Sequence, residues 1–186
     1  MFKKRFLLVF IVLILNFNIS IADEKDIIIK EIYNTKSMEF SFIQKSNGIE
    51  EKGNCILLFP NKLKCIYMDK NKKELVVNKN KLAITQKRYN KSYFYPVKNS
   101  PFIKVLNKDS LINFIESSEM KKMNGVTSII IDEKNQNKIK IFFNKNSELA
   151  GWLIKDRFNN DISFLINITS KNKEYTDKDF IIPNLN

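Results

Sequence analysis

The chain has 186 residues, a formal net charge of +12, no histidine, two cysteines and four glycines. The lack of histidine excludes Ser-His-Asp and Cys-His catalysis and most transition-metal sites, and the sparse glycines form no phosphate-binding loop. The cations are nearly all scattered lysines, which favours a solvated surface over a nucleic-acid interface and leaves a weak attraction to anionic membranes open.

The first 22 residues are typical of a secretory signal peptide. Residues 3–5 are basic, residues 6–15 are apolar, and small residues precede a cleavage site after Ala22. A membrane anchor would need about 20 apolar residues, and this run meets asparagine and serine too soon. We therefore expect residues 1–22 to be removed on export, leaving residues 23–186 as one domain of 164 residues with a charge of +9.

A short helix and a series of strands are expected after the cleavage site. Residues 23–34 carry apolar side chains at helical spacing behind an acidic first turn. Residues 37–45 alternate as in a half-buried strand, with Phe40, Phe42 and Gln44 on one side. Further strands are expected at residues 53–59, 63–68, 74–78, 81–85 and 92–96.

The two cysteines lie in the arms of one predicted hairpin. A loop of residues 60–62 places Cys55 near Cys65 in neighbouring strands, whereas a loop of residues 59–61 places them directly opposite each other. Two cysteines in an exported chain indicate a disulfide; the alternative is two buried free thiols that behave as small apolar residues. Two thiols without histidine do not complete a zinc site, so we expect no metal.

The periodicity becomes helical at residues 99–118 and then returns to strands. Ser100 and Pro101 suit the start of one short helix, and Asp109 or Ser110 could cap a second. The remaining strands, separated by asparagine-rich turns, are expected at residues 126–132, 138–143, 148–155 and 161–169.

These elements predict a mainly β fold: an open antiparallel half-barrel of about ten or eleven strands, with two or three short helices as a lid over an apolar cavity. The same apolar residues could instead fill a core, because a lined cavity and a packed core use the same residue types.

Carboxylates lie at strand ends and turns without forming a marked pair, so we expect no enzyme and no cofactor.

Four segments also carry a family resemblance. They are Phe42-Ile43-Gln44, the stretch from Gly53 to Pro60 that continues to Tyr67, NSPFIKVL at residues 99–106, and Phe180-Ile181-Ile182-Pro183. Their order and spacing resemble the periplasmic outer-membrane lipoprotein carrier family, LolA, over nearly all of residues 23–186. The residue directly after the predicted cleavage site is Asp23 and not a cysteine, which favours the soluble carrier over the receptor of that system, itself a lipoprotein.

The resemblance implies a monomeric periplasmic carrier that binds no nucleic acid. Such carriers take the acyl chains of outer-membrane lipoproteins from the inner-membrane ABC transporter LolCDE and pass them to the outer membrane, often to a receptor, LolB. Two alternatives stay open: a binding module for another small apolar ligand, such as a lipid or a quinone-like molecule or an acylated signal protein, and a structural envelope protein with a filled core.

The resemblance further implies that the cavity wall is made of inward-facing apolar residues, largely aliphatic and without strong polar groups. The candidates are Phe40, Phe42, Leu57, Leu63, Tyr67, Phe102, Leu106, Ile139, Ile141, Phe143, Trp152, Ile162, Phe164 and Ile166. Where the family has an arginine before the hairpin proline, this chain has Phe59, so we name Phe59 and Pro101 as lid or hinge candidates. A Cys55–Cys65 bridge would staple two strands at the cavity wall.

Overall fold

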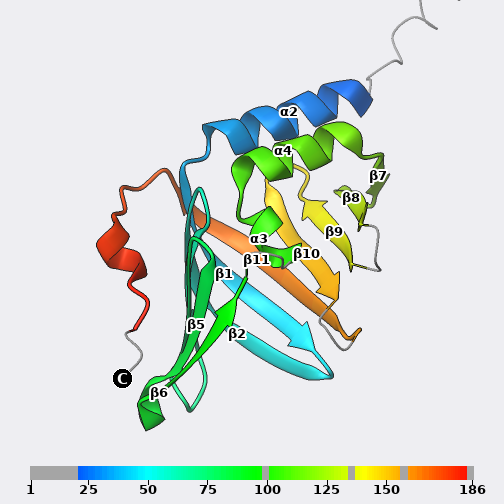
Figure 1. The fold of residues 1–186 in the computed structure, drawn as a ribbon. Helices are drawn as coiled ribbons and strands as arrows, with labels where there is room; N and C mark the ends of the chain where they lie inside the picture. The colour runs from blue at the N-terminus through cyan, green and yellow to red at the C-terminus, as the bar shows by residue number, and fades with distance from the viewer. Residues whose placement is uncertain (1–20, 98–100, 134–136, 156–158, 184–186) are drawn as a thin grey trace, which may run out of the picture.

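The computed structural model describes residues 21–97, 101–133, 137–155 and 159–183 (Figure 1). The predicted signal peptide lies almost wholly outside these ranges, as do the proposed cap Ser100 and Asn135, which belongs to the predicted turn between the strands expected at residues 126–132 and 138–143. Within the described residues, no helix is both long enough and apolar enough to cross a membrane.

The described part of the chain contains three α-helices and two short 3-10 helices. They are α2 (Ile21–Asn34), α3 (Pro101–Val105), α4 (Lys108–Ser117), η1 (Lys87–Tyr89) and η2 (Asp177–Phe180). Helices α2 and α4 lie side by side across one end of the sheet (Figure 1). The expected two or three short helices are thus present.

One antiparallel sheet contains all eleven strands of the described residues, in the order β6-β5-β4-β3-β2-β1-β11-β10-β9-β8-β7. Their bounds are β1 (Ser37–Ser46), β2 (Ile49–Leu58), β3 (Lys62–Tyr67), β4 (Lys73–Asn78), β5 (Lys81–Gln86), β6 (Lys91–Pro96), β7 (Met120–Met123), β8 (Val126–Glu133), β9 (Asn137–Phe143), β10 (Leu149–Lys155) and β11 (Asp161–Lys171). The ends β6 and β7 do not pair with each other, which confirms the predicted open sheet.

Asparagine sets many of the hairpin turns. Asn47-Gly48 and Asn124-Gly125 both have positive φ at each residue, the conformation that two-residue hairpin turns require. Asn61 has φ of 60° and closes the β2–β3 turn. The β2–β3 register pairs Cys55 with Cys65, so of the two loops considered from the sequence the hairpin adopts that of residues 59–61.

Apolar alternation places one face of the sheet against the helices. In β1, Phe40 and Phe42 are buried while Ile43 on the other face is exposed. Leu106 from the turn between α3 and α4 and Ile115 from α4 are fully buried in the same core. Burial of these side chains stabilises the fold by roughly 1.5–3 kcal/mol each.

Helix α4 begins earlier than either proposed cap allows. Its N-cap is Asn107, whose side-chain oxygen accepts a hydrogen bond from the Ser110 amide at 2.9 Å. The prediction of Asp109 or Ser110 was wrong because Asn107 has extended backbone angles and a side chain that reaches this otherwise unbonded donor.

The C-terminal motif has a structural role on the outer face of the sheet. Helix η2 lies against β3 and β4, and the Phe180 side chain is fully buried. The Asn78 side-chain amide donates to the Phe180 carbonyl at 3.0 Å. Together these contacts fix residues 177–180 against β3 and β4.

Candidate functional site

A row of aromatic rings crosses the inner face of the sheet. Phe164 of β11 stacks on Trp152 of β10 with ring centroids 4.7 Å apart and on Phe42 of β1 at 4.6 Å. Phe42 then meets the ring of Tyr67 from β3 edge-on at 4.9 Å. These rings join both halves of the sheet through the central β1–β11 pair, and such contacts add to the energy of area burial.

An apolar cavity of about 280 Å³ lies beside this row, between β3–β5 on one side and β10–β11 on the other. Its wall is mostly aliphatic and aromatic, and it is partly open to solvent. The lining residues are Gln44, Leu63, Cys65, Tyr67, Lys73, Leu75, Leu82, Ile84, Val97, Trp152, Ile154, Ile162 and Phe164. This is near the lower limit for a small-molecule pocket.

One part of the cavity wall is polar. The Tyr67 hydroxyl donates to the Gln44 side-chain oxygen at 2.8 Å, and Lys73 places its ammonium 3.8 Å from the centre of the Tyr67 ring while pairing with Glu51. Burial, followed by the negative charges of Glu51 and Asp69, raises the pKa of the Tyr67 hydroxyl. The hydroxyl therefore stays protonated, and the expectation of a wall without strong polar groups was wrong here because Gln44 and Lys73 face inward.

The structure divides the sequence-predicted lining residues into two groups. Leu63, Tyr67, Trp152, Ile162 and Phe164 border the cavity. The others described lie in the filled part of the inner face or close to it; they are Phe40, Phe42, Leu57, Leu106, Ile139, Ile141, Phe143 and Ile166. The side chain of Phe102 lies outside the described residues, as does that of Pro101.

Several wall residues were not singled out from the sequence. Leu75, Leu82 and Ile84 come from β4 and β5, and Ile154 comes from β10. The alternation within residues 73–78 and 81–86 could have identified Leu75, Leu82 and Ile84 as inward-facing, because every second residue of a strand shares one face.

Cys55 and Cys65 are bonded to each other on the inner face. Both are buried, and Cys65 lines the cavity. The bridge therefore joins β2 to β3 at the cavity wall.

Phe59 lies where the hairpin meets the helices. Its ring packs partly against the core, and its amide donates to the Lys36 carbonyl at 3.0 Å. Lys108 of α4 holds its ammonium 5.5 Å from the centre of the Phe59 ring and donates to the Tyr33 carbonyl of α2 at 3.0 Å. Desolvation lowers the pKa of Lys108.

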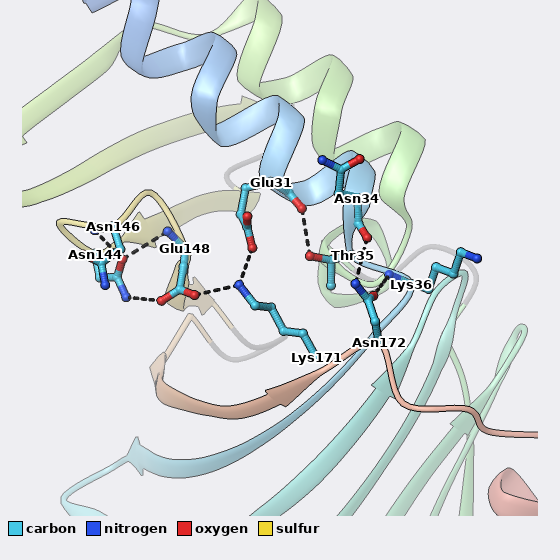
Figure 2. Close-up of polar contacts among 9 residues, drawn as sticks. All are labelled: Glu31, Asn34, Thr35, Lys36, Asn144, Asn146, Glu148, Lys171 and Asn172. Atoms are coloured by element: carbon cyan, nitrogen blue, oxygen red, sulfur yellow. Dashed lines mark hydrogen bonds and ion pairs between the residues drawn. The ribbon is translucent and has the colours of Figure 1, made fainter.

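A second polar cluster ties α2 to the sheet (Figure 2). Lys171 of β11 pairs with Glu31 of α2 at 2.6 Å and with Glu148, in the β9–β10 turn directly before β10, at 2.8 Å. The Asn172 side chain accepts from the Lys36 amide at 2.7 Å and donates to the Asn34 carbonyl at 3.1 Å. The C-terminal end of α2 is therefore fixed to the central strands.

Comparison with protein families shows to which family the chain belongs. The family model described as outer membrane lipoprotein carrier protein LolA matches residues 33–183. The chain belongs to the LolA family. This confirms the resemblance found in the sequence, and members of this family are carriers and binding modules rather than enzymes. No curated protein matches the sequence significantly.

Solved structures show a distant likeness in fold. A LolA superfamily protein from Nitrosomonas europaea is 7% identical, with a TM-score of 0.44 over 88% of this chain and 98% of that chain. LprF from Mycobacterium bovis is 13% identical, with a TM-score of 0.42 over 88% and 97%. A Pseudomonas aeruginosa MucA/MucB complex matches at 9% identity, with a TM-score of 0.43 over 87% and 61%. The family assignment rests on the family model.

Proposed function

We propose that the protein is a periplasmic carrier that binds the acyl chains of lipoproteins released from the inner membrane and carries them to the outer membrane. The observation that carries the proposal is an apolar cavity on the inner face of an open sheet in a LolA-family chain. LolCDE would deliver the cargo, and a receptor such as LolB would accept it.

The free energy of acyl-chain hydration explains why a carrier is needed. Each methylene removed from water contributes roughly 0.8 kcal/mol. A sixteen-carbon chain exposed to water therefore costs on the order of 12 kcal/mol by the same measure, so an acylated lipoprotein does not cross an aqueous compartment unaided.

The cavity must enlarge to hold such a cargo. Its volume of about 280 Å³ is small, and the neighbouring inner face is filled by residues such as Leu57, Leu106 and Ile141. Leu106, in the turn between α3 and α4, and Ile115 of α4 belong to this filling, so moving the two helices away from the sheet would extend the cavity. We propose that these helices form the lid.

The lid contacts differ from those of the family pattern. Phe59 replaces the usual arginine and packs against the core, while Lys108 reaches from α4 to the Phe59 ring and to α2. The Asn61 amide also donates to the Leu106 carbonyl at 2.9 Å. We propose that three contacts hold the lid closed: Lys108 with the Phe59 ring, Lys108 with α2, and the Asn61 amide with the Leu106 carbonyl.

Charged substitutions in the cavity wall test the carrier function. We expect Leu82→Asp and Ile162→Asp to abolish the co-purification of triacylated lipoproteins with the protein from the native periplasm, as measured by mass spectrometry. Leu165→Asp and Ile66→Asp are matched controls, because both residues are exposed on the opposite face. Loss of cargo from all four variants would contradict a cavity-specific role.

A second function uses the same cavity for a smaller apolar ligand. The volume of about 280 Å³ and the Gln44–Tyr67 pair suit a molecule with one polar group. Free phospholipid or a quinone-like molecule in the purified protein, without lipoprotein, would favour this function. A purified protein that is empty and takes up no apolar ligand would favour a structural role.

A further inference from the structure

The positive charge is concentrated in one stretch of the chain. No acidic residue occurs between Glu74 and Asp109, and the stretch contains eight cations. They are Lys79, Lys81, Lys87, Arg88, Lys91, Lys98, Lys104 and Lys108. The lysines are scattered along the chain, but the acidic residues are not. This stretch therefore carries a local excess of positive charge.

This stretch includes β5, η1 and β6, which form one end of the open sheet. Figure 1 shows the β5–β6 hairpin projecting away from α2 and α4. We call residues 87–96 the basic lip. Arg88 and Lys91 are exposed there, and Lys87 pairs with Glu74 at 2.6 Å while its side chain stays 53% exposed.

Three tyrosines accompany these cations. Tyr89, Tyr93 and Tyr95 are 53%, 46% and 47% exposed, so about half of each residue is open to solvent without a covering element. Tyrosine combines an apolar ring with a polar hydroxyl and is enriched where protein meets the membrane–water interface.

The basic lip adjoins the cavity. Tyr93 pairs across the strands with Ile84, and Tyr95 pairs with Leu82. Both partners line the cavity, and residues directly opposite in paired strands share one face of the sheet. The two tyrosines therefore extend the cavity wall to the outer edge of the sheet.

We infer that the basic lip docks on the surface of a membrane that contains anionic phospholipid. Arg88, Lys91 and Lys87 attract the negative headgroups, because basic residues near such a surface are each held by its potential. Tyr93 and Tyr95 enter the interface and bring the mouth of the cavity to the bilayer. Acyl chains then pass between bilayer and cavity along an apolar path; this last step alone rests on the proposed carrier function.

Vesicle flotation with the exported protein tests the docking. We expect binding to vesicles of phosphatidylglycerol and phosphatidylethanolamine, weakening with added salt, and no binding to phosphatidylcholine vesicles. The double variant Arg88→Glu/Lys91→Glu should bind at least tenfold more weakly. The control Lys121→Glu/Lys145→Glu carries the same change in net charge at exposed sites outside the lip and should stay within twofold.

A tryptophan at the lip tests insertion independently of charge. In Tyr95→Trp, we expect phospholipids brominated in the upper acyl chain to quench the added emission, while buried Trp152 provides the background measured in the wild-type protein. Circular dichroism checks that each variant is folded. Equal weakening by both charge-reversed variants, absent binding to anionic vesicles, or no quenching of the new tryptophan would each overturn the inference.

The cargo variants separate this inference from the carrier function. Leu82→Asp should lose lipoprotein cargo and still float with anionic vesicles. Arg88→Glu/Lys91→Glu, isolated with its cargo bound, should keep the cargo and fail to float with the vesicles. Vesicle binding without any cargo would support the docking even if the carrier function failed. Loss of vesicle binding in Leu82→Asp would overturn the view that the charges of the lip carry the docking.

Discussion

At the scale of single residues, close backbone approach limits what the inner face accepts. A Cβ atom added at Gly53 would meet the Ile66 carbonyl oxygen of the next strand and lie 2.7 Å from the Phe42 ring. Phe42 belongs to the aromatic row, so the missing side chain of Gly53 leaves the space that this ring fills.

We expect Gly53→Ala to lower the free energy of unfolding by about 3 kcal/mol, at the upper end of the range for overpacking, because a backbone carbonyl cannot move aside like a side chain. Urea denaturation measures the change. Gly48→Ala is the control: it meets no atom within 4 Å but has φ of +76°, so it should cost only about 1 kcal/mol. Equal effects of the two substitutions would contradict this explanation.

The disulfide also belongs to the residue scale. We expect the protein purified without reductant to keep an unmodified mass after alkylation in denaturant and to gain two adducts only after reduction. With a sequence separation of 10, loop-closure entropy predicts that Cys55→Ala/Cys65→Ala lowers the unfolding free energy by about 2–3 kcal/mol. Two adducts without reductant would show free thiols instead.

At the scale of elements, helix α4 depends on a single polar contact at its start. Asn107 lies between α3 and α4, has extended backbone angles and caps α4. Because α4 packs on α2, the start of α4 also sets how firmly the helices cover the sheet.

We expect Asn107→Ala to lower the free energy of unfolding by about 1 kcal/mol, since the Ser110 amide loses its acceptor. Ser110→Ala keeps that amide and its bond, so it should change stability by less than about 0.5 kcal/mol. Thermal or urea unfolding of both variants provides the comparison. A larger loss in Ser110→Ala would restore Ser110 as the cap.

At the scale of the whole molecule, the Lys171 cluster joins three parts of the chain that are distant in sequence: α2, the β9–β10 turn and the last strand (Figure 2). Hydrogen bonds from Lys171 and Asn144 lower the pKa of Glu148, and those to Glu148 and Glu31 raise the pKa of Lys171. The cluster is thus a pH-dependent link between the helices and the sheet.

A carboxylate with a lowered pKa contributes stability above its unfolded-state pKa and loses it as the pH falls through the folded value. The stability difference between wild type and Lys171→Met should therefore be present at pH 7 and shrink as the pH falls below about 4.5. Melting temperatures from pH 7 to pH 3 measure it. Lys155→Met, which breaks the exposed pair with Asp161, should cost less at pH 7; a pH-independent difference for Lys171→Met would contradict the linkage.

Much of the sheet was predictable because its signals are local. Alternation located β1 and β11, and Asn-Gly turns mark hairpins whose conformation those two residues favour. Strand β7 escaped prediction because Met120–Met123 has no alternation of its own and is almost wholly exposed. It is recognised only through its pairing with β8.

The sequence by itself determined the class of fold and the inward face of most strands, because apolar and polar residues alternate along each strand. It also indicated the family, through the order and spacing of four short segments. Only the tertiary structure decided that β1 pairs with β11, that Gln44 and Tyr67 form a polar point in an apolar wall, and that the cavity occupies one part of the inner face. These features depend on strands that are far apart in sequence meeting at one register, and no local pattern contains that information.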